Sequence, residues 1–464
     1  MTTTEPRPTE PRATAPRVDA PPERADTLWH NTDFVRFWAG EGLSMFGSQV
    51  TNMALPLTAV IVFDASSEQV GLLRFAQMVP YLFLALAFGV WVDRGRRKPV
   101  MMLANGARLV LIASVPVLSH YHLLSIDELL LIAGVIGIFS VLFDVSWMSY
   151  VPTLVRSSRH YVDANQKLGV TQSTTDVAGP GAAGVLIGWL GPTTALLLDA
   201  VSYLASLTSL VSIRTVEPPA PPVERRSFGR ELVEGVRWVF GHRVLRPLAM
   251  LAPFTNFSLT CISTLFLLYG LRAHHLSPAA IGLVFSASSI GALLGALLSK
   301  RLMRRCPVGP LYGCALACLY AAPLLIPLAG GPRPLIIALF ILSLVLSYFG
   351  SGLSNVIQLS LRQTCTPTSM MGRMSAAFRT LLFGGGALGG LCAGLLGGAL
   401  GLHAALVLVT VCSAAMLVPI ALSPVVRLRA MPVPVDDVSP AVPAAPHTDT
   451  DPVIDPLTDK VAQS

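Results

Sequence analysis

The acidic residues of this sequence are unevenly distributed, and their positions limit where proton chemistry can occur. No Asp or Glu lies between Gly235 and Val435, so a proton-binding carboxylate within the apolar segments must come from the first half of the chain. An ionisable side chain in such a segment is energetically costly and is a functional candidate by default. Five acidic residues lie in or beside apolar segments: Glu41, Asp93, Asp144, Asp176 and Asp199.

Asp144 and Arg108 are the first candidates for binding a proton or a cationic substrate. Each lies about nine residues from the same end of its apolar segment, a depth of about 13 Å at helical rise. Equal depth permits an ion pair. Two interpretations therefore stay open for Asp144: a proton or cation site, favoured if the carboxylate is buried, and a static ion pair with Arg108.

Asp199 and Arg74 also lie at depths that permit pairing, near the other end of their segments. They are further proton-coupling candidates, although a structural role is favoured for Asp199. Glu41 and Asp176 are shallow and are expected at solvated cavity mouths. Uncharged polar residues offer either substrate contacts or hydrogen bonds between helices, namely Gln49, Asn52, Asn256, Asn355 and Gln358. Gln49 and Asn52 share one helical face at i,i+3 spacing.

Other kinds of chemistry have little support. The histidine pairs at 120/122 and 274/275 have no nearby carboxylate or thiol, so no metal site is expected. The seven cysteines form no CxxC motif and mostly lie in apolar runs, where they are interpreted as small buried hydrophobes. No GxxxxGK[ST] motif occurs, so ATP-driven transport would need another subunit. We expect no cofactor and no enzymatic activity.

The elements that position these residues are predicted from composition. Of 464 residues, 53% are hydrophobic and only 13% are charged, about half the charged share of a soluble protein. This composition is typical of a polytopic, all-α membrane protein. Twelve segments are long enough to span a bilayer: 37–62, 70–92, 99–119, 129–152, 171–190, 193–213, 247–270, 279–299, 308–328, 334–360, 374–398 and 402–423.

Basic residues predict the orientation of these segments. Loops after even-numbered segments contain 23 Lys and Arg residues, whereas loops after odd-numbered segments contain two, Arg272 and Arg333. Because cytoplasmic loops carry the excess of basic residues, both termini and the central loop are predicted to be cytoplasmic. This topology explains the net charge of +7 without nucleic acid as a partner.

The chain is expected to have five parts. Disordered cytoplasmic tails are predicted at 1–33 and 430–464, two six-helix halves at 34–213 and 247–429, and a cytoplasmic linker at 214–246. Residues 228–240 of the linker have helical periodicity and predict a helix on the membrane surface. Its apolar face contains Leu232, Val236, Val239 and Phe240, opposite Arg230, Glu234 and Arg237, with Arg230 and Glu234 at i,i+4 spacing.

Similar motifs recur in the two halves, as in transporters built from repeats. The second segment ends in GVWVDRGRRK (89–98), and the eighth ends in GALLSKRLMRR (295–305), with glycines and basic clusters in register. The fifth and eleventh segments are both rich in glycine. With these features the chain, from about Phe34 to Arg429, resembles the major facilitator superfamily. The segment 89–98 is similar to its signature loop GxLADRxGRK, although Trp91, Val92 and Arg96 depart from that pattern.

The resemblance implies twelve helices in two pseudo-symmetric halves, with the first, fourth, seventh and tenth lining a cavity. It also implies a cytoplasmic gate in which Asp93 meets the start of the eleventh helix. The gate motif consists of Gly89, Asp93, Arg94, Arg97 and Lys98. The alternative is that these residues only set the membrane topology and cap helix ends. Gly179, Pro180 and Gly184 resemble the antiporter motif of the fifth helix. The Arg that many proton-coupled members carry in the fourth helix is absent.

A narrower resemblance is to the branch that contains the enterobactin exporter and related efflux proteins. It rests on ELVEGVRWV (231–239), LDAVSY (198–203), SLRQ (360–363) and GRMSA (372–376). We therefore predict proton-coupled export of a small amphipathic molecule, such as a drug, antibiotic or siderophore, by alternating access. The expected partners are this molecule, protons and the lipid bilayer of a bacterial plasma membrane, with the protein as a monomer. The alternatives are an importer or uniporter of a nutrient and, from another class, a non-transporting membrane sensor or enzyme.

Overall fold

The computed structural model describes residues 28–93, 95–155, 158–215, 217, 228–367 and 370–432, and within these ranges it contains helices and no strands. The first half of the chain comprises η1 (Leu28–His30), α1 (Thr32–Phe63), α2 (Ser67–Phe83), α3 (Ala85–Asp93), α4 (Arg97–His120), α5 (Ile126–Leu154), α6 (Ser158–Leu190) and α7 (Pro192–Ser212). The second half comprises α8 (Phe228–Gly241), α9 (Leu245–Arg272), α10 (Pro278–Arg305), α11 (Val308–Ala321), η2 (Ala322–Leu324), α12 (Leu325–Leu328), α13 (Arg333–Thr364), α14 (Met371–Leu400), α15 (Leu402–Ala415), α16 (Leu417–Leu422) and η4 (Pro424–Arg427).

Local sequence signals explain where several helices begin. The side chain of Asn31 accepts a hydrogen bond from the amide of Phe34 and so caps α1, which starts inside the stretch predicted as a tail. Ser66 and Gln69 form a reciprocal capping box at the start of α2. Ser277 caps α10 and is followed by Pro278 at the first helical position. Each cap satisfies backbone N–H groups that have no partner within the helix.

Ten helical segments of the described chain are long and apolar enough to cross a membrane. The second predicted span does not qualify, because a turn at Leu84 divides it into α2 and α3. The fifth lies within the 33-residue α6, whose length is sufficient but whose sequence is more polar. The all-helical membrane fold is thus confirmed, while the number of twelve spans stays a prediction.

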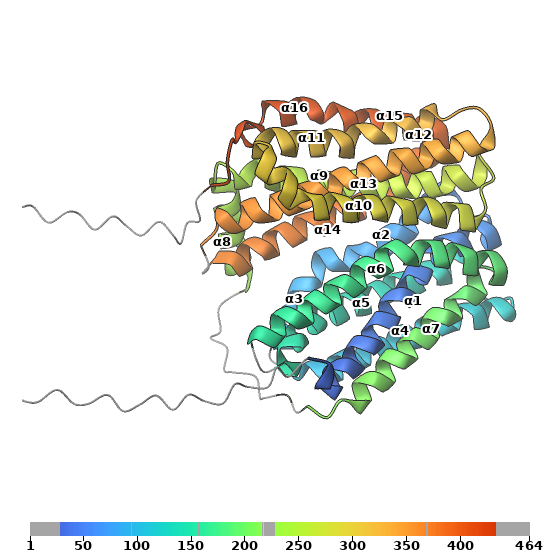
Figure 1. The fold of residues 1–464 in the computed structure, drawn as a ribbon. Helices are drawn as coiled ribbons and strands as arrows, with labels where there is room; N and C mark the ends of the chain where they lie inside the picture. The colour runs from blue at the N-terminus through green and yellow to red at the C-terminus, as the bar shows by residue number, and fades with distance from the viewer. Residues whose placement is uncertain are drawn as a thin grey trace, which may run out of the picture.

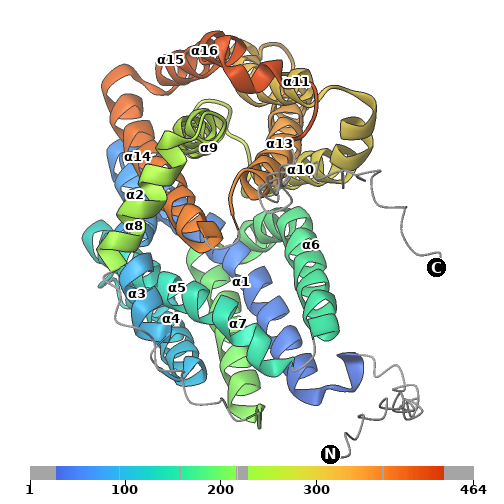
Figure 2. The same ribbon diagram turned by 90° about the vertical axis from the view of Figure 1, so that its left-hand side faces the viewer.

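The helices form two bundles that meet at one end (Figure 1). One bundle contains α1 to α7, and the other contains α9 to α16. At the right of Figure 1 the bundles are in contact; at the left, where α3 and α8 lie, they are separated. We call these the closed end and the open end. Figure 2 shows the molecule from the open end, with α9 to α16 above α1 and α4 to α7.

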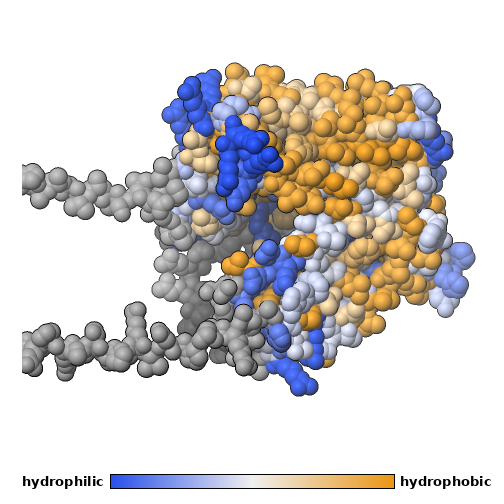
Figure 3. All heavy atoms as spheres, viewed as in Figure 1, coloured by the Kyte–Doolittle hydropathy of each residue, from blue (hydrophilic) through white to orange (hydrophobic). Residues whose placement is uncertain are grey.

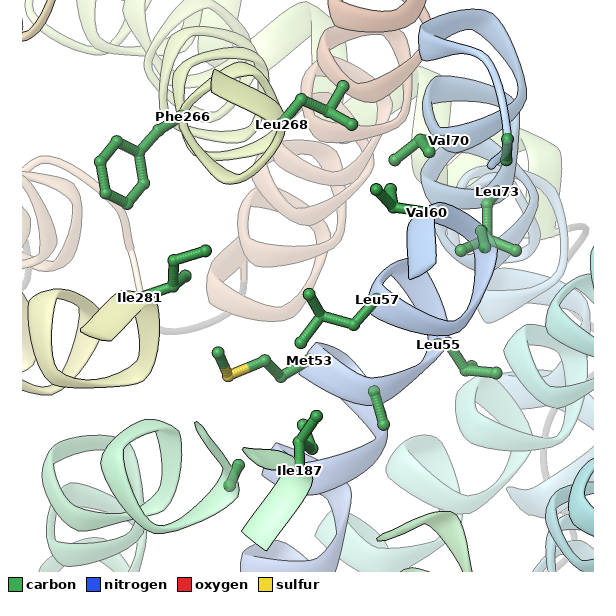
Figure 4. Close-up of a cluster of buried hydrophobic side chains, with 14 of the residues drawn as sticks. Met53, Leu55, Leu57, Val60, Val70, Leu73, Ile187, Phe266, Leu268 and Ile281 are labelled. Atoms are coloured by element: carbon green, nitrogen blue, oxygen red, sulfur yellow. The ribbon is translucent and has the colours of Figure 1, made fainter. Parts of the chain in front are cut away.

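The hydrophobic cores show the same arrangement. One buried cluster spans both bundles and includes Leu57 of α1, Leu73 of α2, Phe266 of α9 and Ile281 of α10, as Figure 4 shows. Two further clusters are each confined to one bundle, one around Tyr150 and the other, which also includes residues of α8, around Tyr312. The shared core therefore joins the two bundles toward the closed end.

Glycines permit close helix crossings between the bundles. At the α2–α14 crossing, a Cβ built on Gly71 would lie 2.5 Å from the Cα of Gly394. At the α6–α10 crossing, a Cβ on Gly184 would lie 2.5 Å from the carbonyl oxygen of Pro278. Small residues let helix backbones approach in this way inside a membrane. These two crossings close the space between the bundles.

Candidate transport cavity

Two adjoining cavities lie between the bundles, with volumes of about 500 Å³ and about 640 Å³. They share four lining residues, Gln49, Asn52, Arg74 and Met78. Figure 3 shows the molecule hollowed between the two bundles on its left-hand side, with hydrophilic residues around the opening and hydrophobic residues over much of the surface beyond it. A small molecule could therefore reach the cavities from the open end.

Arg108 is the centre of a buried charge cluster in the first cavity. It is 5% exposed, and its guanidinium carbon lies 4.3 Å from the ring centre of Phe143 and 4.5 Å from that of Tyr203. Its Nη2 donates a hydrogen bond to Asn105, while its Nε has no partner within the described ranges. The arginine interacts electrostatically with three carboxylates, which belong to Glu41, Asp144 and Asp199. The guanidinium of Arg108 thus interacts with three acidic side chains.

Each carboxylate of this cluster has a different set of partners. Asp144 accepts a hydrogen bond from the Tyr81 hydroxyl at 2.7 Å. Asp199 is fully buried and accepts hydrogen bonds from the hydroxyls of Thr51 and Ser202. Glu41 is 7% exposed, and its Oε2 has no hydrogen-bond partner in the described part of the chain.

The ion pairs that equal depth permits are not formed. The ion pairs of the described residues include neither Asp144 with Arg108 nor Asp199 with Arg74. Arg74 instead donates to the backbone oxygen of Asn52 at 3.0 Å. Depth along a helix does not determine which way a side chain faces around it, and Arg74 faces the central cavities while Asp199 faces α1.

The polar residues proposed for substrate contact divide into two groups. Gln49, Asn52 and Asn355 line the cavities, and Gln49 donates to Asp176 at 2.9 Å. Asn256 and Gln358 are absent from both linings. Asn256 bonds to the carbonyl of Leu382 at 2.6 Å and thereby joins α9 to α14, whereas Gln358 lies beside Tyr312 of α11. These last two residues serve helix packing, the other role considered for them.

Only part of the predicted gate motif can be placed. Arg94 and the side chain of Asp93 lie outside the described residues, and Gly89 has open space around it. The amides of Arg97 and Lys98, at the start of α4, each donate to the carboxylate of Glu217 at 2.6 Å. This cap by a linker residue is not detectable from sequence, because Glu217 is far from α4 along the chain and has no motif around it.

The start of α14, the expected partner of Asp93, is in contact with α8. Arg373 of α14 pairs with Glu234 of α8 at 2.8 Å. Gly235 fits against the α14 backbone, since a Cβ there would lie 2.5 Å from the carbonyl oxygen of Arg373. The predicted pair of Glu234 with Arg230 cannot be tested, because the side chain of Arg230 lies outside the described residues.

The fifth-helix motif contacts both bundles. A Cβ on Gly179 would lie 2.5 Å from Cγ of Gln49, so this glycine makes room for a cavity residue. The amide of Gly181 donates to the Ser286 hydroxyl of α10 at 2.7 Å. Gly184 crosses α10 closely, as described above. The motif therefore lies at the contact between the halves.

Several other polar contacts were not predicted. Arg379 of α14 lines the first cavity and interacts electrostatically with Asp144 of the opposite bundle. Arg272, at the end of α9, donates to the backbone oxygen of Ala65 and so bridges the closed end. One sequence signal could have identified Arg272, since it is one of only two basic residues in the odd-numbered loops.

Comparison with known proteins gives a consistent family assignment. A family model described as "Transmembrane secretion effector" matches residues 28–451. A protein named multidrug efflux pump Tap from Mycolicibacterium fortuitum is 26% identical over 373 residues, which cover 77% of this chain and 87% of the pump. Enterobactin exporter EntS from Escherichia coli O1:K1 is 29% identical over 323 residues, which cover 67% of this chain and 71% of the exporter.

Solved structures show the same fold at lower sequence identity. The nucleoside transporter NupG aligns with a TM-score of 0.69 and 11% identity, over 84% of this chain and 98% of that one. A bacterial homologue of the iron transporter ferroportin, solved in an inward-facing state, aligns with a TM-score of 0.62 and 16% identity, over 85% and 99% of the two chains. At these identities the likeness establishes the major facilitator fold alone.

Proposed function

The chain belongs to the transmembrane secretion effector family of the major facilitator superfamily, and from this premise we propose that it exports a small amphipathic molecule in exchange for protons. It is a membrane transport protein rather than an enzyme. The efflux pumps and siderophore exporters among its relatives favour export over uptake of a nutrient. The sensor and enzyme alternatives have no support from the family.

The observation that carries proton coupling is the charge cluster around Arg108. Three carboxylates interact with Arg108 in a largely buried site, Arg379 acts in addition on Asp144, and within the described chain one oxygen of the Glu41 carboxylate has no hydrogen-bond donor. Burial of uncompensated negative charge is costly, and uptake of a proton removes that cost. Asp144 and Glu41 both line the first cavity, although Glu41 is 7% exposed and is not at the solvated mouth expected for it. We assign the coupling proton to this pair.

The second part of the proposal concerns orientation. The open end carries α3, the start of α4 and α8, which flank or belong to two of the basic segments that predict a cytoplasmic location, the loop after the second predicted span and the central linker. With this end in the cytoplasm, the structure corresponds to the state that receives substrate from inside the cell. Closing this end would bring the 89–98 motif toward the start of α14, and opening the shared core would release substrate outside.

Accumulation of fluorescent dyes and radiolabelled siderophores tests the proposal. Cells with and without the protein are compared, before and after addition of a protonophore. Lower accumulation that the protonophore reverses is the expected result. Higher accumulation in the expressing cells would instead establish uptake, and lower accumulation that resists the protonophore would refute proton coupling.

A further inference from the structure

Arg74 occupies the place where the two cavities meet. It extends from α2 and lines both cavities. On one side a Cβ built on Gly390 of α14 would lie 2.8 Å from the Cβ of Arg74, so only a glycine leaves room there. Tyr348 of α13 lines the second cavity together with Arg74. The side chain is therefore in contact with the interface between the two bundles.

The charge of Arg74 is not balanced by the protein. Within the described ranges no carboxylate pairs with it, and its recorded polar contact is the bond from Nη2 to the Asn52 backbone oxygen. Asp176, in the same cavity, is instead held by the amides of Gln49 and Gln172. Arg108 differs because three carboxylates act on it. A guanidinium carries five N–H donors and favours planar oxyanions as partners.

The surroundings of Arg74 suit an organic anion better than a free inorganic ion. The second cavity is lined by apolar and aromatic side chains such as Met78, Phe285 and Leu267, together with the hydroxyls of Ser263 and Ser289. Such a wall accommodates an apolar or aromatic body and leaves a few hydrogen bonds for orientation.

We propose that Arg74 binds an anionic oxygen of the transported molecule and that the substrates are amphipathic organic anions. This inference rests on the proposed export function and adds the class of substrate to it. A negative interior potential favours outward movement of an anion, so this charge would assist export. Substrate binding at Arg74 would also join the bundles, because the guanidinium extends from one of them and Tyr348 and Gly390 belong to the other.

A binding experiment on the purified full-length protein tests this inference. The probes are naphthalene-2-sulfonate and its neutral analogue naphthalene-2-sulfonamide, and the readout is the shift of the thermal unfolding midpoint with probe concentration. The wild-type protein should be stabilised saturably by the sulfonate and much less by the sulfonamide. Arg74→Gln should weaken sulfonate binding by about tenfold or more, as expected for loss of a charge-assisted hydrogen bond. Arg301→Gln, an exposed site at the end of α10, should bind as the wild type does.

The outcomes separate this inference from the export function. Equal stabilisation by both probes, no stabilisation by the sulfonate, or unchanged sulfonate binding in Arg74→Gln would overturn it. If Arg74→Gln does not fold, Arg74→Lys decides, since it keeps the charge but not the planar fork. That variant should still prefer the sulfonate, with weaker affinity, and loss of the preference would overturn the inference. This binding measurement uses no proton gradient. Its result therefore does not depend on whether the protein exports its substrate in exchange for protons.

Discussion

The guanidinium of Arg272 in the second bundle donates a hydrogen bond to the backbone oxygen of Ala65 in the first bundle and lies 3.6 Å from a carboxylate oxygen of Asp64. Asp64 terminates α1 in a left-handed conformation, with φ 46°, which presents this turn to α9. The Asp64 side chain is 98% exposed, so its charge contributes little. The bond to the carbonyl is therefore the stronger link between the bundles at this point.

Replacement of Arg272 by Ala should loosen the closed end. Loss of the bond is expected to shift the population toward states in which this end is open, because the link exists only while the bundles touch there. Spin labels at Ser66 and Ala273 should report a broader and longer distance distribution. Arg333→Ala is the matched control, since Arg333 bonds to the His275 carbonyl within its own bundle at 2.8 Å. Equal broadening in both variants would contradict the role assigned to Arg272.

Gly184→Ala should disrupt the α6–α10 crossing. The new Cβ would lie 2.5 Å from the Pro278 oxygen, so the helices must separate. We expect a loss of thermal stability of about 1–3 kcal/mol, typical of overpacking, and impaired transport. Gly188→Ala on the same helix meets no atom within 4 Å and should be neutral or slightly stabilising, because Ala is favoured over Gly in helices. Equal thermal unfolding midpoints for the two variants would contradict the close packing of α6 against α10 at Gly184.

The Asp144→Asn variant should distinguish a role of this carboxylate in proton coupling from a role in folding. The amide oxygen can still accept the Tyr81 hydrogen bond, but Asn does not ionise and so cannot bind and release a proton. Efflux driven by a pH gradient should therefore fall by about 10²-fold, the scale of a removed proton-transfer group. Exchange of substrate down its own gradient should persist. Both are measured in proteoliposomes.

A control on the same helix is Asp127→Asn, an exposed residue in the first turn of α5. It should retain gradient-driven efflux. Unfolding of the Asp144 variant would favour a structural role for this carboxylate, and full gradient-driven activity would exclude Asp144 from the coupling pathway.

Gly235→Ala should detach α8 from α14. A Cβ at this position would press on the Arg373 carbonyl at 2.5 Å, and the Glu234–Arg373 ion pair, with both side chains partly exposed, contributes too little to compensate. Hydrogen exchange of the α8 amides should accelerate by about tenfold, which corresponds to about 1.4 kcal/mol of local stability. Gly241→Ala, with no atom within 4 Å, should leave exchange unchanged. Comparable protection in both variants would show that α8 is held by other contacts.

Hydropathy and loop charge predicted much of this fold, because a bilayer requires long apolar helices and sorts basic residues by side. The break at Leu84 escaped prediction, since apolar residues continue on both sides of it. The linker helix was predicted from its periodicity and is present as α8, whereas its placement on the membrane surface stays a prediction. Its close approach to α14 at Gly235 was not predicted.

The site was predicted less well than the fold. Ionisable residues in apolar segments identified Asp144, Arg108 and Arg74, all of which line the first cavity. Their partners could not be inferred, because a rotation of about 100° per residue around the helix axis decides which neighbour a side chain meets. The Tyr81–Asp144 bond and the Glu217 cap depend on such orientations and on contacts between distant parts of the chain.

The shared core lies toward one end of the molecule, so a small rotation about it would produce a larger displacement at the other end. The part of α1 between Thr32 and the start of the shared core at Val50 is about 27 Å long. A rigid rotation of about 10° about this core would move the far end of α1 by about 5 Å. Among the described residues, the clusters around Tyr150 and Tyr312 contain none of the opposite bundle, so such a rotation would leave both of them intact. Small displacements at the glycine crossings would therefore be enough to open or close the path through the protein.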